Sequence, residues 1–161
     1  MSKTSAENVK KSLVSYDIYY SVNYWPKMGH GNYGIIVLNM QDRSTFTGGL
    51  HETTANRMHL RAAIEALAVI PAGSVAVLHT NSKYVIDGLR RNWVKGWCKR
   101  GWKRTDGTMV PNHDLWMMLH DLAKDRHLER VLIPNHVDNE HMKKSRALAQ
   151  GAKATTPPFD Q

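Results

Sequence analysis

The sequence predicts a domain of the mixed α/β class, and two observations carry that prediction. Three short segments rich in β-branched and aromatic residues, at 14–23, 35–38 and 44–50, follow one another with tight connections. This arrangement is typical of an antiparallel meander. After residue 53 the pattern changes, and segments with apolar residues at helical spacing alternate with short apolar runs. We therefore expect a mixed sheet covered by helices.

The first part of the chain supplies the three antiparallel strands. Val14, Tyr16, Ile18 and Tyr20 are characteristic strand residues of the first segment. A glycine-bearing loop around Gly29, Gly31 and Gly34 then leads into the second strand, and a turn at 39–43 leads into the third.

Helices and strands alternate in the rest of the chain. Thr53 or Thr54 can cap a long helix that Pro71 ends, and a buried strand at 75–78 follows. Residues 80–82 (Thr-Asn-Ser) offer caps for the next helix. The remaining expected elements are helices at 83–90, 115–123 and about 140–152, with a strand at 131–133.

Composition and charge limit the function classes. The 161 residues suffice for one domain, which we expect at 13–153 between flexible tails at 1–12 and 154–161. No segment has the ~20 apolar residues of a membrane span, and residues 1–12 lack the apolar core of a secretory signal. Cys98 is the single cysteine, which excludes an internal disulfide and fits a reducing compartment. The 22 Lys and Arg against 14 Asp and Glu give a charge of +8, which favours a polyanionic partner.

Five ordered stretches carry a resemblance to a known family. They are NYGIIV at 32–37, TANRMHLRAAIEAL at 54–67, HTNSKYVIDGL at 79–89, NWVKGWCKRGWKRTDGTMVPNHDLW at 92–116 and IPNHV at 133–137. Together they resemble the type 1 ribonuclease H catalytic domain over nearly all of residues 14–153. The resemblance implies a five-stranded mixed sheet, with three antiparallel strands, then two parallel strands, and helices on both faces.

The resemblance also implies a catalytic site, in which four acidic side chains hold two Mg²⁺ ions that cleave the RNA strand of an RNA–DNA hybrid. The histidine of the family's active-site loop falls on His136. The four acidic positions fall on residues that are not acidic: Ser21, His59, Asn81 and Arg146.

A shift of the alignment does not restore the acids. Segments 18–41, 74–86 and 141–158 contain no Asp or Glu. Glu65 follows His59 by six residues, which on a helix is about 240° of net rotation, so it faces elsewhere. Acids at the four positions would lower the charge from +8 to +3. We therefore predict that the metal site is lost and that the chain needs no cofactor.

Each of these residues also has a simpler interpretation. Ser21 is then a small residue at a strand end, and Asn81 a helix cap. His59 is then a packed histidine, and Arg146 a solvated helix residue. Alternatively, Arg146 binds a phosphate directly where the family holds metal. A zinc site of His59, His136 and His141 is a further alternative, although their spacing matches no recognised metal motif.

The family's basic protrusion is retained, and it predicts binding to a nucleic-acid backbone. The alternative interpretation is that the tryptophans of this segment form a small satellite core and that its charges are merely solvated. The family's minor-groove positions fall on Lys27, Ala55 and Asn56, of which only Asn56 is a comparable amide, and Glu52 replaces a phosphate-pocket arginine. The residues expected to bind nucleic acid are Thr54, Asn56, Tyr84, Trp93, Lys95, Trp97, Lys99, Arg100, Trp102, Lys103, Arg104 and Asn112.

Three functions follow as hypotheses. The first is a non-catalytic ribonuclease H-like protein that binds an RNA–DNA hybrid or duplex through the basic protrusion. The second is a protein–protein interaction scaffold built on the same fold, and the third is a hybrid ribonuclease with residual activity. In each case we expect an intracellular protein of the cytoplasm or nucleus with no membrane partner.

Overall fold

The computed structural model describes residues 13–90 and 93–152. The predicted tails at 1–12 and 154–161 lie outside the described residues. Five strands form one sheet in the order β3-β2-β1-β4-β5. Their bounds are β1 (Ser15–Trp25), β2 (His30–Leu38), β3 (Arg43–Leu50), β4 (Val75–Thr80) and β5 (His127–Leu132).

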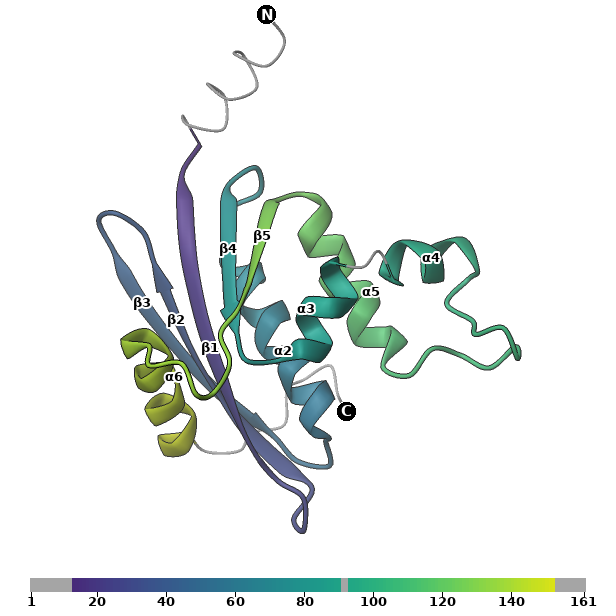
Figure 1. Cartoon of the computed structure of the whole chain (residues 1–161), viewed down its shortest axis with the longest axis horizontal. Helices are drawn as coiled ribbons and strands as arrows, with labels where there is room; N and C mark the ends of the chain where they lie inside the picture. The colour runs from purple at the N-terminus through teal and green to yellow at the C-terminus, as the bar shows by residue number, and fades with distance from the viewer. Residues whose placement is uncertain (1–12, 91–92, 153–161) are drawn as a thin grey trace, which may run out of the picture.

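The pairing of the strands confirms the predicted sheet. β1 and β2 are antiparallel, with Ser21 opposite Gly34, and β2 and β3 are antiparallel as well. β4 runs parallel to both β1 and β5. β1 is therefore the central strand, and its two neighbours run in opposite directions beside it (Figure 1).

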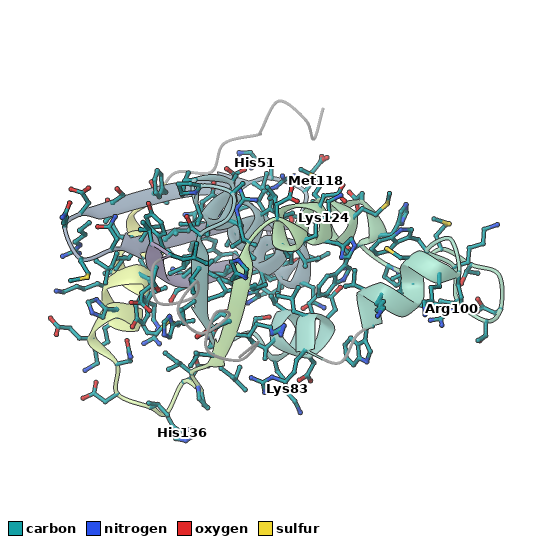
Figure 2. All side chains as sticks on the ribbon, turned by 90° about the horizontal axis from the view of Figure 1, so that it is seen from above. His51, Lys83, Arg100, Met118, Lys124 and His136 are labelled. Atoms are coloured by element: carbon teal, nitrogen blue, oxygen red, sulfur yellow. The ribbon has the colours of Figure 1, made fainter. Side chains whose placement is uncertain are left out.

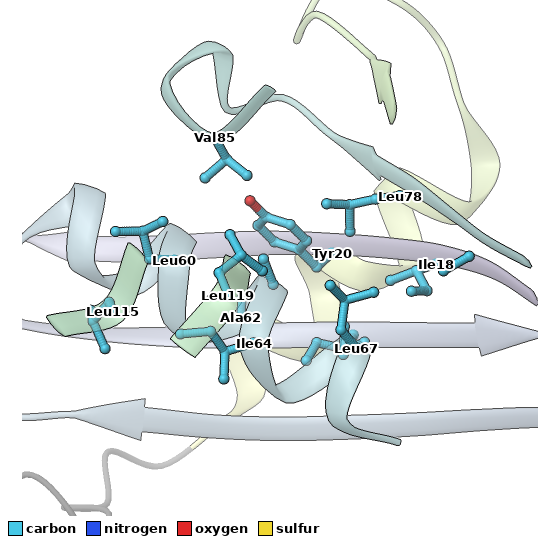
Figure 3. Close-up of a cluster of buried hydrophobic side chains, with 14 of the residues drawn as sticks. Ile18, Tyr20, Leu60, Ala62, Ile64, Leu67, Leu78, Val85, Leu115 and Leu119 are labelled. Atoms are coloured by element: carbon cyan, nitrogen blue, oxygen red, sulfur yellow. The ribbon is translucent and has the colours of Figure 1, made fainter. Parts of the chain in front are cut away.

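The hydrophobic core lies between the sheet and α2 (Ala55–Ala68), with α5 (His113–Lys124) packed against α2. Ile18, Tyr20 and Leu78 enter this core from β1 and β4, and Leu60 and Leu67 enter it from α2 (Figure 3). The spacing of apolar residues along α2 places one whole face of this helix in the core. This packing also fixes the position of the N-terminal end of α2, which carries His59.

α6 (Glu140–Gly151) covers the opposite face of the sheet, over β1 and β2 (Figure 1). The approach is close at Gly34. A Cβ atom at this position would collide with the backbone carbonyl of Ser145 and lie 2.6 Å from the amide nitrogen of Ala149. Glycine at position 34 thus allows the backbones of α6 and β2 to come together.

The chain between β4 and α5 forms α3 (Lys83–Arg90) and α4 (Trp93–Lys99), followed by a loop that extends away from the sheet (Figure 1). We call residues 93–111 the protrusion. Figure 2 shows Arg100 far from the sheet, within this projecting segment. Among the described residues, none of the helices is long and apolar enough to cross a membrane.

Three expectations about local structure are wrong. Gly31 and Gly34 lie within β2 and not in a loop, since the hairpin turn is confined to the residues around Gly29, whose φ is +64°. β5 begins at His127, four residues before the predicted start, because it pairs with β4 from Val75 onward. β1 likewise extends to Trp25 because β2 pairs with it as far as His30.

Candidate functional site

Ser21 lies in the middle of the sheet and is sealed by α6. Its Oγ is 2.7 Å from the Oγ of Ser145, which in turn donates a hydrogen bond of 2.8 Å to the backbone carbonyl of Met142. With the proton of Ser145 directed to Met142, Ser21 is the donor of the short contact, and the carbonyl of Met142 is a more distant second acceptor at 3.4 Å from the Oγ of Ser21. Both serine side chains are buried. The hydroxyl groups therefore satisfy each other beneath the helix and do not face an open cleft.

The position that faces Ser21 on α6 is Ser145, one residue before the predicted Arg146. Neighbouring residues on a helix are about 100° apart, so Arg146 points away from this contact and is only half-buried. The placement of the family's fourth acidic position at Arg146, based on the A-L-A sequence at 147–149, stays a prediction. The burial of Ser145 and Met142, which no local sequence signal marked, determines which side of α6 meets the sheet.

His59 lies on the first half of α2, with its ring 5.8 Å from the ring of Tyr20. Burial lowers the pKa of His59 from 6.5 to about 4, so the ring is neutral at pH 7. Its Nδ1 atom is buried and has no hydrogen-bond partner among the described residues. A neutral imidazole at this place carries no charge that would attract or replace a metal ion.

Asn81 follows β4 and donates a 2.6 Å hydrogen bond from Nδ2 to Oδ1 of Asn135. The interpretation of Asn81 as a helix cap is wrong, because the backbone amide of Val85 donates to Oγ of Ser82 at 3.2 Å. Asn81 thus connects the end of β4 to the loop that precedes α6. His136, in the same loop, is exposed and lies at the surface of the molecule (Figure 2).

The five residues that the resemblance places at the catalytic site come from five different parts of the fold. Ser21 lies on β1, His59 on α2, and Asn81 directly after the end of β4. His136 lies in the loop before α6, and Arg146 lies on α6. Across the described residues, no group of three or more His, Cys, Asp or Glu side chains is arranged to hold a metal ion. The donor set here consists of hydroxyl, amide and neutral imidazole groups, which does not fit Mg²⁺, a cation that prefers carboxylate oxygen.

A second group of polar side chains connects α2 to α5. Thr54 caps α2, and its Oγ1 accepts the amide of Arg57 at 3.2 Å. Arg57 binds Asp114 through two hydrogen bonds of 3.0 and 2.7 Å and donates to Oδ1 of Asn112 at 3.3 Å. The guanidinium of Arg57 lowers the pKa of Asp114. Asn112 also donates to the hydroxyl of Tyr84 at 3.2 Å.

Sequence reasoning missed Arg57. It selected Thr54 and Asn112 as phosphate contacts, and the structure brings both close to this arginine. No pattern along the chain indicates the pair with Asp114, because the two residues are 57 positions apart and meet only through the packing of α2 against α5. Asn56, the predicted minor-groove residue, is exposed on the first turn of the same helix.

The tryptophans of the protrusion attach it to the domain. The ring of Trp97 lies 6.2 Å from those of Trp93 and Trp102 and 5.7 Å from that of Trp116 on α5. Trp116 is fully buried and donates from Nε1 to the hydroxyl of Tyr84 at 2.8 Å. Trp102 is buried as well, whereas Trp93 is 38% exposed. Trp102 and Trp116 belong to the main hydrophobic core, and Trp97 packs against it. Trp93 has the most surface available for a ligand.

The cationic side chains of the protrusion are all exposed and come from α4 and the loop after it. Within the described parts of the chain, none of them pairs with a carboxylate. Asp106, the acid of this loop, accepts hydrogen bonds from the backbone amide and hydroxyl of Thr108. The members of this unpaired cluster are Lys95, Lys99, Arg100, Lys103 and Arg104.

Comparison with solved structures places this fold in the ribonuclease H class. The crystal structure of LC9-RNase H1, described as a type 1 RNase H with the type 2 active-site motif, has a TM-score of 0.67 and 28% sequence identity. The match covers 86% of this chain and 70% of that chain. LC11-RNase H1, crystallised in complex with an RNA/DNA hybrid, has the same fold, with a TM-score of 0.61 at 15% identity over 85% of this chain and 95% of that chain.

Sequence comparison then defines the family. The RNase H family matches residues 17–151, and the chain belongs to this family. Ribonuclease H of Novosphingobium aromaticivorans is 40% identical over 67% of this chain and 75% of its own length. Ribonuclease H of Yersinia pestis is 39% identical over 80% of this chain and 83% of its own length.

Proposed function

We propose that this protein is a nucleic-acid-binding member of the RNase H family that has lost metal-dependent cleavage. The single observation that carries the proposal is the buried Ser21–Ser145 contact of 2.7 Å beneath α6. By resemblance, position 21 is where the family holds its first metal-binding acid. A two-metal reaction needs anionic oxygens that are open to substrate, and this position offers a shielded hydroxyl.

The other three positions support the same proposal. His59 is a half-buried neutral ring, Asn81 is hydrogen-bonded to Asn135, and Arg146 has positive charge. None of these groups neutralises a divalent cation, and Arg146 repels one. Each change therefore lowers the affinity for Mg²⁺.

Backbone binding rests on the protrusion. None of its five exposed cations forms an ion pair with a carboxylate among the described residues, and only Arg104 interacts electrostatically with Asp106, so most of this charge is available to phosphates. The contacts of Trp97 with Trp102 and Trp116, which belong to the main hydrophobic core, fix this charge relative to the domain. A nucleic-acid partner accounts for the excess of basic residues and favours a place in the cytoplasm or nucleus. The domain itself extends over residues 13–153 in this proposal.

The second candidate function is an active hybrid ribonuclease, which the names and identities of the relatives favour. Ribonuclease HI of Caulobacter vibrioides is 37% identical over 80% of this chain. Activity in this chain would need a different set of metal ligands from the four family positions. A labelled RNA–DNA hybrid separates the two candidates.

The test is incubation of the full chain with the labelled hybrid and Mg²⁺ or Mn²⁺, together with an anisotropy titration over increasing salt. We expect no RNA product above the rate without protein. We also expect binding whose log affinity falls linearly with log salt, by about 0.9 for each phosphate neutralised. Metal-dependent product that disappears with EDTA would establish the ribonuclease. Absence of both product and binding would contradict both candidates and leave the interaction scaffold.

A further inference from the structure

A groove of about 570 Å³ lies between the C-terminal ends of α3 and α5, the start of α4, and β5. It borders the protrusion, with which it shares Lys95, and lies apart from the other residues described above. Part of its wall is aliphatic, formed by Leu89, Val94, Ala123 and Leu128. The rest is mainly basic, and the residues of this kind are Lys95, His120, Lys124, Arg126 and Arg130.

Among the residues that the structure describes, no acidic residue lines this groove. Side chains along β5 point alternately to the two sides of the strand. Leu128 and Arg130 therefore share the side that lines the groove, while Glu129, between them, faces the other side. Lys124 has an exposed ion pair with Asp121 at 3.5 Å, which is worth little in water. The groove thus has a strongly positive lining around an apolar surface.

Two guanidinium groups are held in place by neutral acceptors. Arg126 donates to the backbone carbonyls of Ile70 and Leu122, both at 2.9 Å. Arg130 donates to the carbonyl of Leu89 at 3.4 Å. The carbonyls at a helix end bring only about half of a negative charge, so each arginine retains net positive charge. Among the described residues, neither arginine forms an ion pair with a carboxylate.

We propose that this groove binds an acidic peptide segment of a partner protein, with an aliphatic side chain against Leu89 and Leu128 and carboxylates beside Lys124 and Arg130. Charge complementarity carries the choice of partner. A second copy of this chain is a poor occupant, because each copy has a charge of +8. A single-stranded nucleic acid is a poorer fit as well, because among the described residues no Trp, Tyr or Phe ring lines the groove for bases to stack on.

The inference does not depend on the proposed loss of catalysis, and a synthetic peptide tests it. The probe is a fluorescein-labelled peptide in which two leucines are flanked by aspartates, titrated with the full chain at physiological salt. We expect Lys124→Glu to weaken peptide binding about tenfold and Arg130→Gln to weaken it about threefold. Glutamine at position 130 retains a donor for the carbonyl of Leu89, which protects the fold. Lys27→Glu, the same charge change on the distant β1–β2 turn, is the matched control.

Two altered peptides and an amide-shift map complete the test. A peptide with serines in place of the leucines should bind about tenfold more weakly or worse, and so should a peptide with asparagines in place of the aspartates. The amide NMR signals that shift should cluster at 88–89, 94–95 and 123–130. Equal weakening by Lys27→Glu and Lys124→Glu, or indifference to the leucines, would reduce the effect to diffuse attraction and overturn the proposal. The proposal would also be overturned if the peptide did not bind and if nucleic acid or a second copy of the chain bound in a way that depends on Lys124.

Discussion

At the scale of single residues, Ser21 decides what the centre of the sheet can do chemically. Its hydroxyl is buried and hydrogen-bonded to Ser145, and both groups are neutral. A carboxylate at the same place would lose its hydration beneath α6, which costs several kcal/mol unless a cation or several donors compensate. The neutral pair therefore suits a closed contact between helix and sheet.

His59 makes the stability of the protein depend on pH. Its pKa is about 4 in the folded state and about 6.5 when exposed, so between these values the unfolded chain binds a proton that the folded chain does not. The contribution of this residue is complete above pH 6.5 and is lost as the pH falls toward 4. We expect the free energy of unfolding to fall by about 1.4 kcal/mol per pH unit in that window, measured by urea denaturation.

Two leucine variants check this assignment. His59→Leu should flatten the pH dependence between pH 6.5 and 4. His136→Leu removes an exposed histidine of the loop before α6 and should leave the slope unchanged. A slope that persists in His59→Leu would show that other groups control acid unfolding.

The sequence predicted the residue types of the site better than their contacts. The amino-acid sequence alone shows that no acidic residue stands at Ser21, His59 or Asn81, because residue identity does not depend on the fold. The partners of these residues are not local: Ser145 is 124 positions from Ser21, and Asn135 is 54 positions from Asn81. Such contacts depend on how α6 and its loop pack on the sheet, which periodicity alone does not specify.

At the scale of elements, the contact of α6 with β2 depends on Gly34. A methyl group there would meet the backbone of the helix, which cannot move away as a flexible side chain could. We expect Gly34→Ala to lower the free energy of unfolding by about 2 kcal/mol, measured by denaturant titration. Exchange of the α6 amides should also become faster, because the helix must shift to admit the methyl group.

Gly151→Ala is the matched control, since a Cβ atom at Gly151 meets nothing within 4 Å. It lies in the last turn of the same helix, where alanine is the better helix former, so its effect should be neutral or slightly stabilising. Equal stability of the two variants would mean that α6 adjusts without cost.

Element types followed from the sequence, but several element ends did not. Thr54 caps α2 as one of the two expected residues, and Lys83–Arg90 has the predicted bounds. The ends of β2 and β5 were missed because pairing with a neighbouring strand extends them through residues of weak strand propensity, such as Gly31, His127 and Glu129. Tertiary pairing thus overrides local preference at these ends.

At the scale of the whole molecule, positive charge is concentrated on the protrusion. We expect the double variant Lys99→Glu/Arg100→Glu to weaken hybrid binding at least tenfold at physiological salt. Its log–log salt slope should fall by about 2, because two phosphate contacts are lost. Anisotropy titrations over a range of salt concentrations measure both quantities.

Lys143→Glu/Lys144→Glu is the control with the same change in total charge. These lysines lie on α6, each in an exposed ion pair of small energetic value. Their replacement should reduce hybrid affinity by less than the change on the protrusion. Equal losses would indicate that net charge alone, and not the protrusion, determines binding.

The position of β1 in the sheet also affects how the protein folds during synthesis. β1 is made first but occupies the centre, and Ser15 pairs with Val75, about 60 residues later in translation. Until β4 has left the ribosome, the nascent β1–β2–β3 meander exposes the backbone edge of β1 and the apolar face that α2 will cover. Completion of the sheet therefore waits for the second half of the chain, and a chaperone that shields apolar strands would act in this interval.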